Sequence, residues 1–120
     1  MNIIVQKFGG TSVKNKECLE NVCRIVTNEY DKGNSVVVVV SAQSGVTDNL
    51  SKKASEITDM PSKRELSVIL SSGEQITAAL LCMCLEQKGK KAISYTGWQL
   101  PITTDSDYTN ANVIDIDTKN

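Results

Sequence analysis

Residues 34–48 read N-S-V-V-V-V-V-S-A-Q-S-G-V-T-D, and the five consecutive valines at residues 36–40 decide the fold class. Valine is stiff and β-branched, so it favours strands. Because successive strand residues point to opposite faces, a strand made only of valines is apolar on both faces. We therefore expect this strand to lie in a sheet that is covered on both faces, which is typical of parallel sheets flanked by helices.

The residues before the valines complete a strand–helix–strand unit. Residues 3–8 are apolar and partly β-branched, which predicts a first strand that stops at Gly9 and Gly10. Thr11 or Ser12 is expected to cap the helix that follows. Five apolar residues recur at helical spacing and form one stripe: Leu19, Val22, Cys23, Val26 and Tyr30. This order predicts a parallel sheet with helices on both sides.

Glycines and capping residues mark the later helices. Gly33 is expected to end the first helix and Gly89 the last one. A polar loop at residues 41–48 leads into a short helix, for which Thr47 or Asp48 is the expected cap. One face of that helix carries Leu50, Ala54 and Ile57.

A long helix and two further strands are predicted in the second half. Ser62 and Glu65 match a capping box, in which a serine cap is followed three residues later by glutamate. Residues 92–95 read as a third strand, and residues 112–116 as a further one.

The composition excludes several classes of function. The chain has 120 residues, a net charge of -1 and a pI of about 5.4, so it offers no basic patch for nucleic acid or a membrane surface. No uninterrupted apolar run reaches membrane-spanning length, and the N-terminus lacks a signal-peptide pattern. The 4 cysteines form no C-x-x-C pair, so we expect reduced, mostly packed thiols in a cytoplasmic protein.

One polar cluster follows the first strand, where ligands bind in open parallel sheets. The two glycines, Gly9 and Gly10, let backbone N–H groups approach a phosphate, and the expected helix N-terminus adds partial positive charge. Lys7 adds a full positive charge, as phosphoryl transfer requires. A glycine turn beside a solvated lysine would have the same sequence, so this pattern alone leaves both interpretations open.

Two further clusters are less specific by themselves. Residues 41–48 offer hydroxyl and amide groups, but an ordinary polar loop would do the same. Gly73 lies inside the long helix, where glycine costs about 1 kcal/mol relative to alanine, which indicates close approach of a ligand or another backbone. Glu74 beside it has the charge to bind a cationic group. The alternative is a glycine of helix packing next to a solvated glutamate.

Taken together, the clusters resemble one family. Residues 7–13, K-F-G-G-T-S-V, are similar letter for letter to the opening motif of aspartate kinases. Residues 36–48 resemble that family's strand followed by S-A-x-x-G-x-T-D, and residues 72–74 resemble its S-x-G-E helix motif. Residues 97–111 resemble its G-x-Q-x-x-I-x-T region with a later alanine. The resemblance therefore runs along essentially the whole chain, in the family's order.

The resemblance implies the amino-acid-kinase fold, a three-layer α/β/α sandwich with a mainly parallel sheet, of which this chain holds a part. It also implies transfer of the γ-phosphoryl group from ATP to the side-chain carboxylate of L-aspartate. The product is 4-phospho-L-aspartate, made in the first step of lysine, threonine and methionine biosynthesis. A homo-oligomeric full-length form is expected.

The resemblance also assigns roles to residues. Lys7 is expected to stabilise the transferred phosphoryl group, and Mg²⁺ to arrive with ATP. The residues expected to contact ATP are Lys7, Phe8, Gly9, Gly10, Thr11 and Ser12. L-Aspartate is expected to be bound by Ser41, Thr47 and Glu74, with Glu74 meeting its ammonium group. A carboxylate acceptor has a pKa near 3.9, so it needs no general base, and the absence of histidine is no obstacle.

Two departures from the family pattern matter. Leu100 and Pro101 stand where the family usually has alanine-glycine, so that turn is expected to differ. Family members are several times longer, with a second Gly-rich motif, most of the adenine pocket and ACT regulatory domains beyond the part matched here. We interpret residues 1–120 as the N-terminal portion of the catalytic domain, active only in the full-length chain. The alternatives are another amino-acid or carbamate kinase, and a non-catalytic binding or subunit module.

Overall fold

In the described residues, a strand–helix–strand unit is followed by a pair of helices and then by two short strands. The structure, a computed structural model, describes residues 2–100, 102–104 and 113–116. Its elements, with η for a 3-10 helix, are β1 (Ile3–Phe8), η1 (Gly10–Val13), α1 (Lys16–Asp31), β2 (Ser35–Val40), α2 (Val46–Ile57), α3 (Lys63–Gln87), η2 (Gly97–Gln99), β3 (Ile102–Thr104) and β4 (Val113–Ile116).

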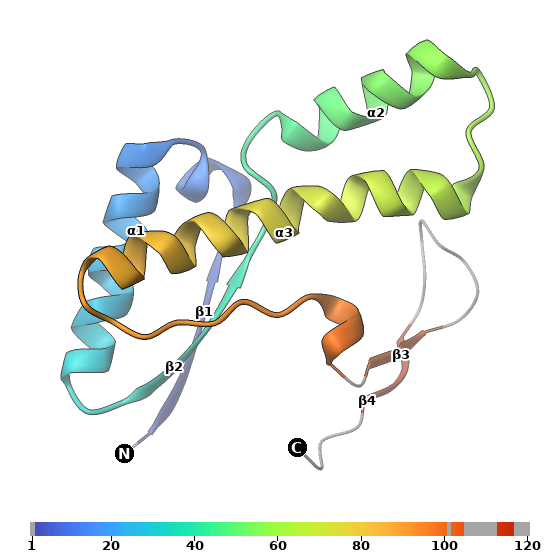
Figure 1. Ribbon diagram of the computed structural model, residues 1–120. Coiled ribbons are helices and arrows are strands. Elements are labelled where there is room, and N and C mark those ends of the chain that lie inside the picture. Colours follow the sequence, from blue (N-terminus) through green and yellow to red (C-terminus); the bar gives the residue numbers. More distant parts are fainter. Residues whose placement is uncertain (1, 101, 105–112, 117–120) are drawn as a thin grey trace.

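Strands β1 and β2 form a parallel pair, and α1 makes the crossover between them (Figure 1). The register pairs Lys7 with Val39 and Phe8 with Val40, so both strands end at the same edge. The predicted strand–helix–strand unit is therefore confirmed. The loops that follow the two strands leave the sheet side by side, which is what a shared binding site needs.

The start of α1 differs from the prediction that Thr11 or Ser12 caps it. Residues Gly10–Val13 first make the separate turn η1, and α1 begins only after Asn15. The side chain of Asn15 accepts a hydrogen bond of 2.9 Å from the Cys18 N–H, so asparagine is the cap. The end of α1 is as predicted, because Gly33 takes a left-handed φ of +90° directly after it.

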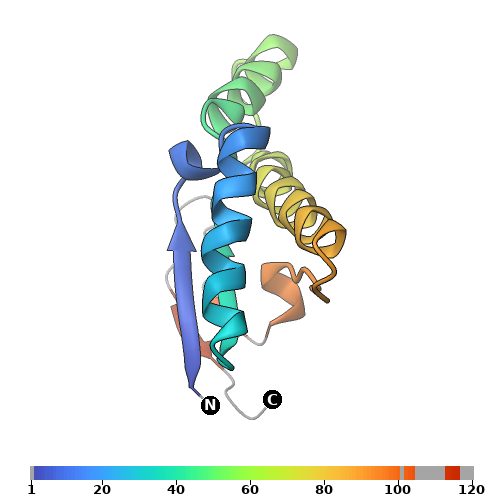
Figure 2. The same cartoon turned by 90° about the vertical axis from the view of Figure 1, so that its left-hand side faces the viewer.

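The core lies between one face of the sheet and the helices α1 and α3 (Figure 2). Four of the five residues of the predicted stripe are buried there, whereas Tyr30 is 55% exposed. The Lys90 ammonium lies over the Tyr30 ring, 5.4 Å from its centre, in a cation–π contact. The buried cluster consists of Val13, Leu19, Val22, Cys23, Val26, Leu81 and Leu85, packed against Phe8, Val36, Val38 and Val40.

The opposite face of the sheet is open, so the prediction that both faces of the valine strand are covered is wrong for the described residues. Val37 is 50% exposed and Val39 47%, and Ile3 and Val5 on the neighbouring strand are more exposed still. Both α1 and α3 pack on the other face. The described residues thus supply a sheet and one helix layer, consistent with part of the expected α/β sandwich.

Helices α2 and α3 form an antiparallel hairpin that extends beyond the sheet (Figure 1). The N-cap of α2 is Gly45, with a left-handed φ of +85°, rather than Thr47 or Asp48. Ala54 is buried against α3, but Ile57 is 86% exposed at the end of the helix. The face predicted for α2 is therefore half-buried at Leu50, buried at Ala54 and exposed in the last turn.

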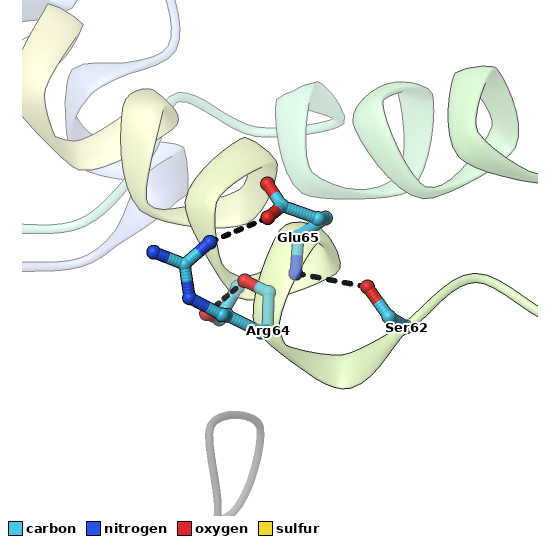
Figure 3. Close-up of polar contacts among 4 residues, drawn as sticks. Ser62, Arg64 and Glu65 are labelled. Atoms are coloured by element: carbon cyan, nitrogen blue, oxygen red, sulfur yellow. Dashed lines mark hydrogen bonds and ion pairs between the residues drawn. The ribbon is translucent and has the colours of Figure 1, made fainter.

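The start of α3 has half of the predicted capping box (Figure 3). Ser62 Oγ accepts a hydrogen bond of 3.3 Å from the Glu65 N–H, as predicted. The Glu65 carboxylate, however, pairs with the guanidinium of Arg64.

By length and hydropathy alone, α3 is apolar enough to cross a membrane. Core helices of water-soluble proteins pass the same test, and Leu81 and Leu85 of α3 lie in the core.

The segment after α3 departs from the prediction of a third strand at residues 92–95. These residues have no regular secondary structure and pair with no described strand, although Ala92 packs against the core. The predicted strand near residues 112–116 is confirmed as β4, which pairs antiparallel with β3, while Asn112 and Pro101 lie outside the described residues.

All four cysteines are free thiols, in agreement with the sequence prediction. Cys23 of α1 is fully buried and hydrogen-bonds with Cys84 of α3. Burial raises the pKa of the Cys23 thiol to about 12, and the bond with Cys84 adds to the rise. The thiolate is the reactive form of cysteine, and a raised pKa keeps this thiol protonated. We therefore interpret Cys23 as a packing residue between the two helices.

Candidate functional site

The loops that follow β1 and β2 are joined by backbone hydrogen bonds. The Ser41 N–H donates to the Phe8 carbonyl at 3.2 Å, which extends the ladder past the last paired residues. The Ser44 N–H then donates to the Gly10 carbonyl at 3.1 Å. The prediction that these two polar clusters lie beside each other is confirmed.

The two glycines of the first loop have different surroundings. A Cβ atom at Gly10 would lie 2.8 Å from the backbone oxygen of Ala42, so only glycine fits without displacing the second loop. A Cβ atom at Gly9 would have nothing within 4 Å, and Gly9 is exposed in extended backbone. Gly10 therefore serves loop packing, whereas Gly9 leaves its backbone open to an approaching group.

A side chain also connects the two loops. Gln43 Nε2 donates a hydrogen bond of 2.9 Å to the carbonyl of Val13, the last residue of η1. Val13 is fully buried in the core. The backbone carbonyl of Gln43 accepts from the Val46 N–H at 3.0 Å, in the first turn of α2. Gln43 thus contacts the end of the first loop and the start of α2 at once.

The third cluster meets the second loop through Gly73. A Cβ atom at Gly73 would lie 2.8 Å from Ala42 Cβ and 3.4 Å from Val46 Cγ1. The glycine inside α3 is therefore explained by close packing against the loop after β2. The helix-packing interpretation of Gly73 is confirmed, and Glu74 is the next residue of the same helix.

Ala42 is the residue on which all three clusters converge. It is 6% exposed, with Gly10 on one side and Gly73 on the other. Ala42 belongs to the S-A-x-x-G-x-T-D pattern, but its packing role was not predicted, because a single alanine among polar residues gives no periodic signal. The requirement for a small residue could have been inferred from the two glycines, since close packing of three backbones needs small side chains at each point of contact.

The remaining predicted site residues differ in exposure and in the face of the sheet on which they lie. Ser41 is half-buried, whereas Lys7, Thr47 and Glu74 are exposed. Lys7 lies on the open face of the sheet, opposite the face on which α3 packs. Within the described part of the chain, the side chains of Lys7 and Glu74 make no hydrogen bond or ion pair, although both backbones belong to regular secondary structure. Both charged groups are therefore available to a ligand.

Phe8 and Ser12 line an open hollow that continues along α1 past Cys18 and Val22. The structure thus keeps the predicted ATP-contacting residues Phe8, Gly9 and Ser12 at or near the surface, while Gly10 is half-buried by the second loop. Among the described residues, no group of three His, Cys, Asp or Glu side chains is placed to hold a metal ion.

The sequence profile of the amino acid kinase family matches residues 2–120. The chain belongs to the amino acid kinase family. Within it, the chain is 53% identical over 118 residues to an aspartokinase of Geobacillus stearothermophilus, covering 98% of this chain and 29% of that protein. It is 51% identical over 118 residues to aspartokinase 2 of Bacillus subtilis (strain 168), with the same 98% and 29% covered.

A solved structure of the family agrees with the fold. The crystal structure of an aspartate kinase from Synechocystis matches with a TM-score of 0.78 at 45% identity, over 82% of this chain and 17% of that one. The resemblance to aspartate kinases and the partial α/β amino-acid-kinase fold are thus confirmed. The chain spans about 29% of the length of the curated relatives it matches first.

Proposed function

We propose that this chain carries the L-aspartate site and one phosphate loop of an aspartate kinase, which transfers the γ-phosphoryl group of ATP to the aspartate side chain. One observation carries the proposal: the glycine turn after β1, the loop after β2 and the Gly73 turn of α3 all meet at Ala42. The identity of about 50% to aspartokinases spans all three segments.

In this proposal the main task of the site is to bring the negatively charged aspartate carboxylate to the negatively charged phosphates of ATP. The acceptor carboxylate is already ionised at neutral pH, because its pKa is near 3.9. It attacks the γ-phosphorus without a general base, and the bond from that phosphorus to the bridging oxygen of ADP breaks. Lys7 and the backbone N–H groups near Gly9 would neutralise charge on the transferred group.

The aspartate end would be held by the residues around the second loop. Glu74 is exposed and has no partner in the described part of the chain, so its carboxylate can meet the substrate ammonium group. The hydroxyl groups of Ser41 and Thr47 would hydrogen-bond the substrate. Since the described residues offer no cluster of metal ligands, we propose that Mg²⁺ arrives bound to the phosphate oxygens of ATP.

A panel of acceptors tests the proposed reaction in the full-length protein. We expect acyl phosphate, trapped as its hydroxamate, from ATP with L-aspartate, and at most a trace from L-glutamate, N-acetyl-L-glutamate or carbamate. Product from a different acceptor would replace aspartate kinase by another kinase of the same fold. No product from any acceptor, together with tight ATP or aspartate binding, would support a non-catalytic module.

Replacing Glu74 should affect aspartate more than ATP. A hydrogen bond to a charged group contributes about 1.5–3 kcal/mol, so Glu74→Ala should raise the KM for aspartate on the order of 10- to 100-fold. The KM for ATP should change less than about threefold, because the ammonium group belongs to aspartate alone.

The matched control is Glu86→Ala, an exposed glutamate near the C-terminal end of the same helix, which should leave both KM values unchanged. Steady-state kinetics with each substrate varied in turn makes the comparison. Equal rises in both KM values for Glu74→Ala, or no rise in either, would show that Glu74 is a solvated helix residue that does not bind aspartate.

A further inference from the structure

The hydrogen bonds between the two loops differ in kind. The bonds from Ser41 and Ser44 use backbone atoms only, so they persist with almost any side chain. The bond from Gln43 Nε2 to the Val13 carbonyl uses a side chain. Of the three, it alone depends on which amino acid stands at its position.

The position of Val13 makes this bond consequential. Val13 is fully buried, so its carbonyl is fixed by the core rather than by the surface. It ends η1, the turn that begins at Gly10 and includes Thr11 and Ser12. A donor attached to the second loop and bound at the end of η1 therefore fixes the distance between that loop and the phosphate turn.

We infer that Gln43 is a positioning residue, which holds the glycine turn of residues 9–13 in place relative to the aspartate loop of residues 41–48. The role rests on the proposed function, in which the first loop holds the phosphoryl donor and the second holds the acceptor. The Gln43 side chain touches neither substrate in this assignment. It acts through Val13 and through the first turn of α2, to which its own carbonyl is bonded.

The geometry around Ala42 explains why such a connection is needed. Gly10 packs against the Ala42 carbonyl so closely that a methyl group would lie 2.8 Å away. That packing prevents the loops from moving closer together, but it does not prevent them from separating. The Gln43 bond and the Ser44 bond oppose separation. Misplacement of reacting groups by about 1 Å can cost on the order of 100-fold in rate, so a small separation matters.

Two substitutions of similar size separate donation from packing. Gln43→Met keeps the length and volume but cannot donate a hydrogen bond. Gln43→Glu keeps the shape but, when ionised, turns an acceptor oxygen toward the Val13 carbonyl. In the full-length protein we expect kcat to fall about 10-fold for Gln43→Met and further for Gln43→Glu, with KM for aspartate changed less than about threefold.

The control is Gln87→Met, at the exposed end of α3, which should behave as wild type. Melting temperatures should stay within about 4 °C for every variant, since one partly exposed hydrogen bond contributes little to global stability. A loss of kcat that follows loss of melting temperature, and that disappears at low temperature, would show only a structural role and overturn the inference.

Amide hydrogen exchange tests the loop connection without any assay of activity. In both Gln43 variants the N–H groups of Ser12 and Ser44 should exchange roughly tenfold faster, while amides in the middle of α1 stay unchanged. Wild-type exchange and wild-type kcat in both variants would overturn the inference and leave the proposed function intact. If the wild-type protein phosphorylates no aspartate, the proposed function fails, and faster exchange in the variants would still establish that Gln43 holds the turn.

Discussion

Lys7→Met should lower kcat of the full-length protein by about 100-fold or more, the effect of removing one key group that stabilises transition-state charge. Lys7 is the last-but-one residue of β1, exposed, and without an ion pair among the described residues. Its charge is therefore not used to hold the fold. Because charge builds on the transferred phosphoryl group, the loss should appear in kcat more than in either KM.

Two companion variants sharpen this expectation. Lys7→Arg keeps the positive charge but replaces a compact ammonium by a planar guanidinium, so it should recover only part of the lost kcat. Lys91→Met removes an exposed lysine far from the glycine turn and should leave kcat unchanged. The kcat values are compared as rates of hydroxamate formation at saturating ATP and aspartate. A Lys7→Met enzyme with near-normal kcat would contradict the proposal that Lys7 stabilises the transferred phosphoryl group.

The strand–helix–strand unit was predictable because its signals are local. The valine strand and the stripe of α1 depend on spacing within a few residues, and the structure reproduces both. The side-by-side arrangement of the two loops follows from the parallel register. The three polar clusters were also identifiable from short motifs in the sequence, and the structure brings them into contact.

The predictions that the structure contradicts are those that depend on neighbouring segments of the chain. Thr11 and Ser12 carry good capping side chains, but the η1 turn precedes α1, and Asn15 becomes the cap. Gly45 displaces Thr47 in the same way, since a left-handed residue already turns the chain into α2. Residues 92–95 have strand-like side chains but pair with no described strand, and strand propensity alone does not form a hydrogen-bonded ladder.

The open face of the sheet has the same origin. Valines at 37 and 39 make burial of that face favourable, but whether it is buried depends on which segments reach it. In the described residues none does, and the apolar face of Ile3, Val5, Val37 and Val39 stays exposed.

Residues 1–120 expressed alone should form no aspartyl phosphate above background. The chain spans about 29% of the length of its aspartokinase relatives, and the proposed site accounts for aspartate and one phosphate loop only. With ATP held by Lys7 and a few amides, the donor would be poorly positioned, and positioning is a large part of phosphoryl-transfer catalysis. A hydroxamate assay beside the full-length protein measures this, and turnover by residues 1–120 would contradict it.

The same piece should self-associate through the open sheet face, because exposed apolar strands favour pairing with another copy where the sheet edge pairs with no further described strand. Sedimentation should show oligomers, and Val37→Lys, which puts a charge on that face, should shift them toward monomer. Ile57→Lys is the matched control: Ile57 is 86% exposed at the far end of α2, so its replacement should leave association unchanged. Since Val37→Lys restores no contact to ATP, its monomer should remain inactive. An active Val37→Lys monomer would show that self-association, rather than an incomplete site, had suppressed catalysis.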